Sequence, residues 1–280
     1  MKLVLTILLA LAFSGAAGAQ TLSPDQIKAI IASPDRTAAD RTNDQRRHPE
    51  DILAFLALKP GLTALDLSAG GGYTTELLAR ALGPTGKVYG QSRPRPATPP
   101  PAPTNPEGNA NPSATPAAAP PPPAAPPRPS PVALADRDSR MKAANVASAP
   151  IVVVVQPFED PVPAEVADGK LDLVTLMFNY HDLGFLNVDR AAMNKAVFKA
   201  LKPGGFYVIA DHSGRPGTGI SESGTLHRIE EAFLRKEVEA AGFKLAGEGN
   251  FLRNPNDPRD KNTPDPPMPK DEFFLKFVKP

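Results

Sequence analysis

The stretch LDLSAGGGYTTELLA, residues 65–79, decides how the rest of the chain is interpreted. An apolar run ending around Asp66 predicts a buried strand over 62–67, and the apolar residues that follow Tyr73 predict a helix. Three glycines, Gly70 to Gly72, lie between these two elements. Glycines let the backbone approach a ligand closely and present its N–H groups at the start of a helix, so the stretch indicates a ligand-binding turn.

Strand and helix signals alternate along the rest of the chain. Apolar runs predict further strands at 87–90, 151–155, 170–178, 206–210 and 273–278. Amphipathic patterns predict helices that begin near Ser23 and His48, and others around 77–82, 193–201 and 226–241. Buried strands separated by helices predict an α/β fold with a Rossmann-like, mostly parallel sheet, helices on both faces and an antiparallel C-terminal edge strand.

Two segments fall outside this pattern. Residues 1–19 combine Lys2, an apolar run and small residues before Gln20, which predicts a secretory signal peptide cleaved after Ala19. Residues 93–131 hold about half of the 35 prolines and little that could build a core, which predicts a disordered insert and a candidate site for a weak proline-recognising partner. The flanking parts, 20–92 and 132–280, are then two halves of one domain.

The composition narrows the classes of ligand. The 31 lysines and arginines nearly balance the 30 acidic residues and are dispersed, so no basic face for nucleic acid stands out. No later segment is long and apolar enough for stable membrane insertion once the signal peptide is removed. We therefore expect a periplasmic or secreted protein that acts on a small-molecule substrate or a protein partner.

The glycine turn is not of the dinucleotide-binding type, because G-x-G-x-x-G would need glycine at position 75, where Thr75 stands. An acid at the end of the first strand followed by Ala-Gly-Gly-Gly resembles instead motif I of the class I S-adenosylmethionine-dependent methyltransferases. The blocks 60–90 and 198–219 are similar to a bacterial branch of that superfamily whose members often carry signal peptides. The resemblance implies a seven-stranded sheet, S-adenosylmethionine over strands one to three and the substrate over strands four and five.

The resemblance also implies roles for residues of the turn. Gly70 and Gly72 would pass the amino-acid moiety of the cofactor, and Asp66 would order the turn and the cofactor's ammonium group. The usual first glycine of the motif is Ser68 here, and the usual strand-two acid that holds the ribose diol is Gln91. An amide forms a weaker hydrogen bond than a carboxylate, so we expect cofactor binding to be weaker by an order of magnitude, about tenfold.

The segment PFED, residues 157–160, follows the third strand, where the adenine would bind. Phe158 would cover the ring, and Glu159 or Asp160 would accept a hydrogen bond from the adenine amine. The alternative interpretation is a core phenylalanine followed by two solvated acids.

The richest cluster is FNYHD, residues 178–182, at the end of the strand 170–178. Tyr180, His181 and Asp182 lie there, and Asp211 and His212 follow the next strand. A histidine takes a proton from a nucleophile during catalysis. We expect His181 or His212 to be the base, with Asp182 or Asp211 orienting it, or else one pair that ties two loops together.

Several alternatives remain. Arg36, Arg41, Arg46 and Arg47, with His48, either contact a substrate carboxylate or phosphate or form a solvated helix face. Met177 stands about where metal-dependent methyltransferases carry an aspartate, which disfavours magnesium and leads us to expect no metal.

A less favoured alternative is a metal-dependent enzyme. Its softer ion would be held by strand-end residues, namely His181, Asp211, His212 and His227. Another is an exported, non-catalytic binding protein on the same fold.

Overall fold

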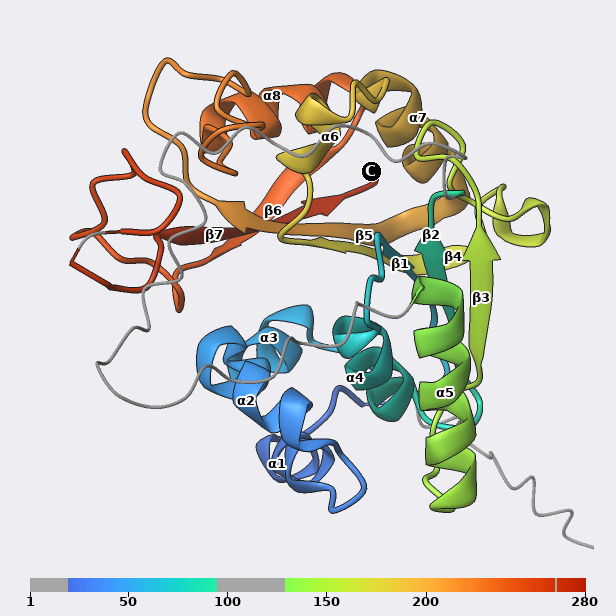
Figure 1. Cartoon of the computed structure of the whole chain (residues 1–280). Helices are drawn as coiled ribbons and strands as arrows, with labels where there is room; N and C mark the ends of the chain where they lie inside the picture. Colours follow the sequence, from blue (N-terminus) through green and yellow to red (C-terminus); the bar gives the residue numbers. More distant parts are fainter. Residues whose placement is uncertain (1–19, 95–128, 265) are drawn as a thin grey trace, which may run out of the picture.

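The computed structural model describes residues 20–94, 129–264 and 266–280 (Figure 1). The predicted signal peptide and nearly all of the predicted insert, 95–128, lie outside the described residues. Within the described ranges, no helix has the length and apolarity needed to cross a bilayer.

A seven-stranded sheet forms the centre of the fold, in the order β3-β2-β1-β4-β5-β7-β6. The first five strands pair in parallel, and β7 is antiparallel to both of its neighbours. The bounds are β1 Thr63–Leu67, β2 Lys87–Ser92, β3 Ile151–Val155, β4 Leu171–Met177, β5 Leu201–His212, β6 Lys244–Gly249 and β7 Glu272–Val278. The predicted Rossmann-like sheet with an antiparallel C-terminal strand is confirmed, although β6 rather than β7 is the edge strand.

Helices cover both faces of the sheet, as predicted (Figure 1). One face carries α1 Pro24–Ala32, α2 Ala38–Arg47, α3 Pro49–Leu56, α4 Tyr73–Leu82 and α5 Ser130–Ala143. The other carries α6 Asp182–Phe185, α7 Arg190–Ala200 and α8 Glu231–Ala240, and a short 3-10 turn, Ala164–Val166, precedes β4. Each face has its own cluster of buried apolar side chains, so the sheet lies between two cores.

Local sequence signals explain most element boundaries. The capping box at Ser23 is present, with Ser23 and Gln26 each bonding the other's backbone N–H. The helix predicted over 226–241 begins only at Glu231, because the residues before it bridge Ser213 through Ile229 at the end of β5. Helix α5 was not predicted, and it begins at Ser130, inside the predicted boundary of the insert.

Candidate functional site

The turn after β1 is built from left-handed backbone. The φ angle is 54° at Ser68, 53° at Gly70 and 78° at Gly72. Gly70 and Gly71 line a cavity of about 280 Å³, which we call the turn cavity. Gly72 does not line this cavity. A Cβ there would come within 2.8 Å of Arg137 Cδ, so Gly72 permits the close packing of α5.

Ser68 keeps a conformation that suits glycine because its side chain is anchored. Its hydroxyl donates to Asn179 Oδ1 over 2.5 Å, which ties the turn after β1 to the segment after β4. A left-handed residue with a Cβ costs about 1–2 kcal/mol relative to glycine, and this hydrogen bond offsets part of that cost. Ser68 therefore closes one side of the turn cavity, which it and Asn179 both line.

Asp66 lies beneath the turn, 2 % exposed. Its two carboxylate oxygens accept from Thr75 Oγ1 at 2.6 Å and Thr175 Oγ1 at 2.8 Å. Burial raises the pKa of Asp66 to about 6, although both threonine hydroxyls favour the charged form. The side chain thus orders the turn by joining β1 to α4 and β4.

Asp66→Asn is expected to remove a pH dependence of stability. The pKa in the folded state, about 6, is above the ordinary value of 3.8, so the folded state binds the proton more tightly. Stability that is present at pH 4 is therefore lost as the pH rises through 6, by at most about 3 kcal/mol. Urea unfolding from pH 4 to 7.5 should show this loss in the wild type relative to Asp66→Asn. Asp25→Asn, on the exposed surface of α1, is the control. If the free energy of unfolding changes with pH in the same way in wild type and Asp66→Asn, the raised pKa of Asp66 is contradicted.

Gln91 is fully buried at the end of β2 and is engaged on both sides of its amide. Its Oε1 accepts from the Ser68 backbone N–H at 3.0 Å, and its Nε2 donates to the Gln156 carbonyl at 2.7 Å. The side chain therefore joins the turn after β1 to the end of β3, and its polar atoms are used within the protein.

Gln91→Glu is expected to destabilise the protein at neutral pH. The variant places a buried charge against the Gln156 carbonyl oxygen, at a cost of about 3 kcal/mol or roughly 6–12 °C in Tm. At pH 5 a protonated glutamic acid donates to that oxygen, so the loss should shrink. Thermal denaturation at pH 5 and 7.5 measures both effects. The control is Gln26→Glu, which keeps the capping box of α1. A Tm equal to that of the wild type at pH 7.5 would refute the two-sided role of the amide.

The segment after β3, residues 157–160, does not line the turn cavity. Phe158 is 4 % exposed and belongs to the core cluster on the α7 and α8 face, which favours the alternative interpretation of this residue. Glu159 and Asp160 are exposed, and Glu159 accepts a long hydrogen bond, 3.4 Å, from the Asp189 N–H. A contact of these acids with an adenine stays a prediction.

Four of the five predicted catalytic residues come together at the ends of β4 and β5. His181 Nδ1 lies 2.6 Å from Asp211 Oδ1, and the His181 backbone N–H donates to Asp211 Oδ2. His181 Nε2 lies 3.2 Å from Asp182 Oδ1, and the rings of His181 and His212 lie 5.5 Å apart. Tyr180 is the exception. Its hydroxyl points toward α7 and α8, where it donates to Glu237 and accepts from Asn194.

The two histidines of this cluster differ in charge. Burial opposes the charged form of His181, but Asp211 and Asp182 outweigh it and raise the pKa of His181 to about 9. Burial lowers the pKa of His212 well below its ordinary 6.5, and Lys270 adds to this effect. The two carboxylates therefore favour a positive charge at His181, whereas His212 is neutral at pH 7.

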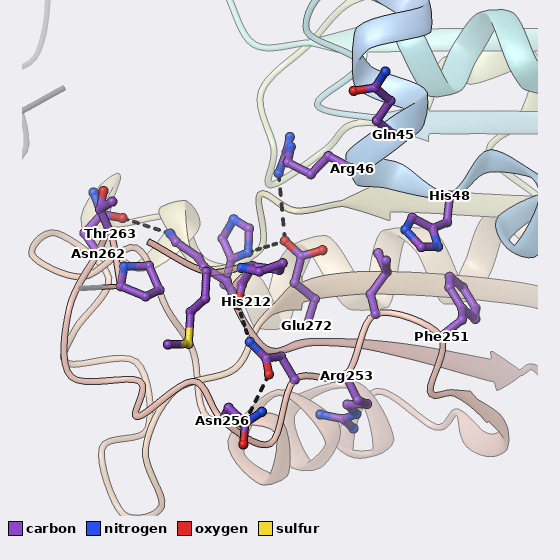
Figure 2. Close-up of a pocket in the computed structure, with 16 residues that line it drawn as sticks. Gln45, Arg46, His48, His212, Phe251, Arg253, Asn256, Asn262, Thr263 and Glu272 are labelled. Carbon is purple, nitrogen blue, oxygen red and sulfur yellow. Dashed lines mark hydrogen bonds and ion pairs between the residues drawn. The ribbon is translucent and has the colours of Figure 1, made fainter. Parts of the chain in front are cut away.

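His212 forms part of the wall of a second, larger cavity of about 730 Å³, which we call the loop cavity (Figure 2). Its lining comes from the end of α2 and from the segment between β6 and β7. His212 Nδ1 lies 2.8 Å from Glu272 Oε1, although the two atoms are not aligned as a hydrogen bond. Burial raises the pKa of Glu272 to about 7.

Arg47 bounds the turn cavity from the helical side. Its guanidinium lies 3.6 Å from the centroid of the Phe178 ring, and its Nη1 atom is buried without a hydrogen-bond partner among the described residues. Burial lowers its pKa to about 10, and Arg46 adds to the effect. A buried N–H donor without an acceptor is costly, so the cavity favours an anionic group that accepts from Arg47.

Two residues of the site were not singled out from the sequence. Glu272 begins β7, and an antiparallel strand brings its first residue to the edge where parallel strands end, which pairs Glu272 with His212. That register is the signal that could have found it. Asn179 lies inside FNYHD, and its amide links Ser68 to Asp182, with Nδ2 2.7 Å from Asp182 Oδ2.

Comparison with known proteins establishes the fold. No protein-family model and no curated protein matches this chain. A SAM-dependent methyltransferase from Aquifex aeolicus is similar in structure, with a TM-score of 0.51, 16% sequence identity, and coverage of 92% of this chain and 100% of that one. A chain in the complex of the Trm112 methyltransferase activator with a methyltransferase of Haloferax volcanii has a TM-score of 0.51 and 17% identity over 92% of this chain and 97% of that chain. The fold is that of the class I methyltransferases.

Proposed function

We propose that this protein is an S-adenosylmethionine-dependent methyltransferase that acts on a small molecule. The observation that carries the proposal is the turn cavity, where the glycine turn after β1 shares a wall with Arg47, whose buried Nη1 has no hydrogen-bond partner among the described residues. The class I methyltransferase fold of the chain supports it.

The residues of the turn cavity fit the amino-acid end of the cofactor. Gly70 and Gly71 leave the backbone open to a ligand, and Arg47 offers a charged donor for a carboxylate. When bound, S-adenosylmethionine supplies an activated methyl group. Gln91 fits the ribose less well, because its amide already bonds Ser68 and Gln156, so the expected weaker affinity remains part of the proposal.

The acceptor would bind in the loop cavity. Phe178, from the wall of the turn cavity, and His212, from the wall of the loop cavity, are in ring contact at 5.6 Å, so the two cavities are neighbours. His212 with Glu272 is placed to take a proton from the acceptor, whereas His181 is enclosed by Asp211 and Asp182. This geometry favours His212 over His181 as the base.

Titration calorimetry with S-adenosylmethionine and S-adenosylhomocysteine at millimolar concentration tests the proposal. We expect saturable heat and a raised Tm. Gly71→Leu should abolish both while the protein stays folded, because a Cβ at Gly71 meets no atom within 4 Å and its φ is not left-handed. Folded wild-type protein that gives neither heat nor a thermal shift would refute the proposal.

A second candidate is an exported, non-catalytic binding protein. The internal engagement of Gln91 favours it, since the usual ribose acceptor is replaced. This candidate predicts that the turn cavity binds carboxylate ligands equally well without an adenosyl group. We also propose export through residues 1–19, which a mature N-terminus at Gln20 in secreted or periplasmic protein would demonstrate.

A further inference from the structure

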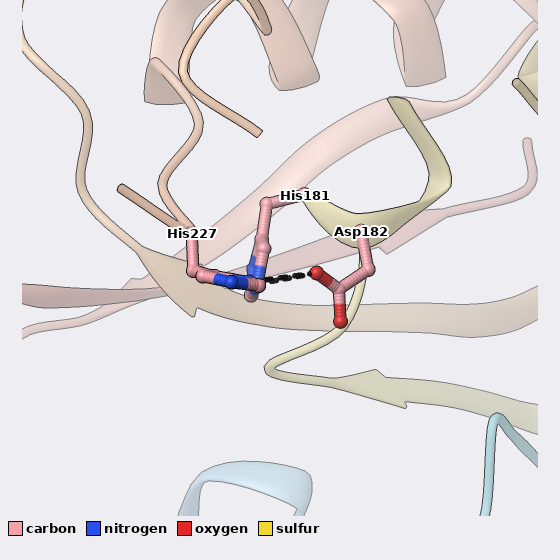
Figure 3. A group of neighbouring side chains, drawn as sticks. All are labelled: His181, Asp182 and His227. Carbon is pink, nitrogen blue, oxygen red and sulfur yellow. Dashed lines mark hydrogen bonds and ion pairs between the residues drawn. The ribbon is translucent and has the colours of Figure 1, made fainter. Parts of the chain in front are cut away.

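Outside both cavities, a group of metal-ligating side chains gathers near the ends of β4 and β5. His181 and Asp182 come from the start of α6, and His227 comes from the segment that precedes α8 (Figure 3). One donor atom from each lies within 4.8 Å of the others. We propose that His181, Asp182 and His227 bind a divalent transition-metal ion of the zinc type. The inference does not depend on the binding of S-adenosylmethionine.

The spacing of the donor atoms suits such an ion. Asp182 Oδ1 lies 3.2 Å from His181 Nε2 and 3.0 Å from His227 Nδ1. Ligands at about 2.0–2.1 Å from a tetrahedral zinc ion are roughly 3.3 Å apart, so an ion fits between these atoms with small side-chain shifts. Two imidazoles and one carboxylate favour zinc and other borderline ions over magnesium or calcium.

Hydrogen bonds to the far sides of the ligands orient them as in a metal centre. His181 Nδ1 faces the fully buried carboxylate of Asp211, which accepts a hydrogen bond, so Nε2 is directed to the cluster. The same carboxylate holds the His181 backbone N–H. Asp182 is fixed through its other oxygen, which accepts from Asn179 Nδ2. Carboxylate–histidine–metal arrangements of this kind fix the ring and its tautomer.

The sequence led us to expect no metal, and the ligand set also differs from that of the less favoured metal-dependent alternative. Asp211 and His212 are not members of the set. Asp211 bonds His181 Nδ1, the ring nitrogen that does not face the ion, and His212 faces Glu272. Asp182 takes their place because it begins α6, one residue after His181. Three protein donors leave a coordination position open for water or for an oxygen or sulfur atom of a ligand.

Zinc titration of tag-free, chelator-treated full-length protein tests the site. We expect one equivalent of Zn²⁺ per chain in competition with a chromophoric chelator, and visible absorption bands of a tetrahedral site with Co²⁺. His227→Ala and Asp182→Asn should weaken Zn²⁺ binding by about 10-fold to 100-fold. Asp211→Asn should weaken it by about 10-fold. His48→Ala is the matched control, because His48 also has a left-handed φ, 49° against 50° for His227, and an exposed ring.

A weaker Zn²⁺ affinity in His227→Ala, with the wild-type affinity retained in His48→Ala, would support the site. The proposal is overturned if folded wild-type protein takes up no Zn²⁺ or Co²⁺, or if His227→Ala and Asp182→Asn bind as tightly as the wild type. His227 and Asp182 are both partly exposed, so these variants test the site even if His181 variants do not fold.

Discussion

Asp257→Ala is expected to lower the free energy of unfolding by about 3–5 kcal/mol, or roughly 10 °C in Tm. Arg228 is fully buried, and its guanidinium donates to both oxygens of Asp257, at 2.8 and 3.2 Å. Asp257 also accepts from the backbone N–H groups of Arg259 and Asp271. Removing the carboxylate leaves a buried cation with only backbone carbonyls as acceptors and leaves two N–H groups without this acceptor, which is the costly way to break an ion pair.

Thermal and urea denaturation measure this effect, with Asp260→Ala as the matched control. Asp260 is exposed and lies in the same segment between β6 and β7, so its removal should shift Tm by about 1 °C or less. The double variant Arg228→Met/Asp257→Leu should recover part of the loss, since an apolar pair leaves no buried charge. Equal Tm values for the Asp257 and Asp260 variants would contradict the assigned role of the buried pair.

Arg47→Met is expected to weaken binding of S-adenosylmethionine by about 10-fold to 100-fold without destabilising the protein. A charge-assisted hydrogen bond to a carboxylate contributes about 1.5–3 kcal/mol, which gives that range. The Tm of the unbound protein should change little, because the buried Nη1 of Arg47 has no hydrogen-bond partner among the described residues and a methionine can still pack on Phe178. Calorimetry and thermal denaturation measure the two quantities on one sample.

Arg46→Met is the control for this experiment. The side chain of Arg46 is 55% exposed and lines the loop cavity, so cofactor affinity should not change. Methylthioadenosine lacks the amino-acid moiety, and its affinity should be equal in wild type and Arg47→Met. If Arg47→Met binds both ligands like the wild type, the cofactor's carboxylate does not contact Arg47.

Much of the fold could be predicted because the central strands are buried and form uninterrupted apolar runs, as in residues 206–210 of β5. Strand β6 could not, since Lys244–Gly249 alternates exposed and half-buried residues and includes two glycines. Helix α5 was hidden because the proline-rich composition runs up to its first turn, where Pro131 fits the start of a helix.

Site residues could be predicted where the end of a strand fixes their position. They could not be predicted where the direction of the side chain decides what the residue contacts. His181 and Asp211 were expected to meet because β4 and β5 are parallel neighbours that end at the same edge. Tyr180 lies two residues after Phe178, whose left-handed φ of 59° turns the chain, so its position next to His181 in the sequence did not reveal that its side chain enters the core. Arg47 stood in a run of arginines, and its contact with Phe178 at the turn cavity depends on where α2 lies relative to the end of β4.

The antiparallel direction of β7 separates the last residues of the chain from the site. Glu272 pairs with His212, whereas Val278 pairs with Phe206, six residues further along the strand. At about 3.4 Å per residue, this places the C-terminal end roughly 20 Å from Glu272. A dye or an immobilisation tag attached after Pro280 would therefore leave both cavities accessible to ligands in surface-based binding measurements.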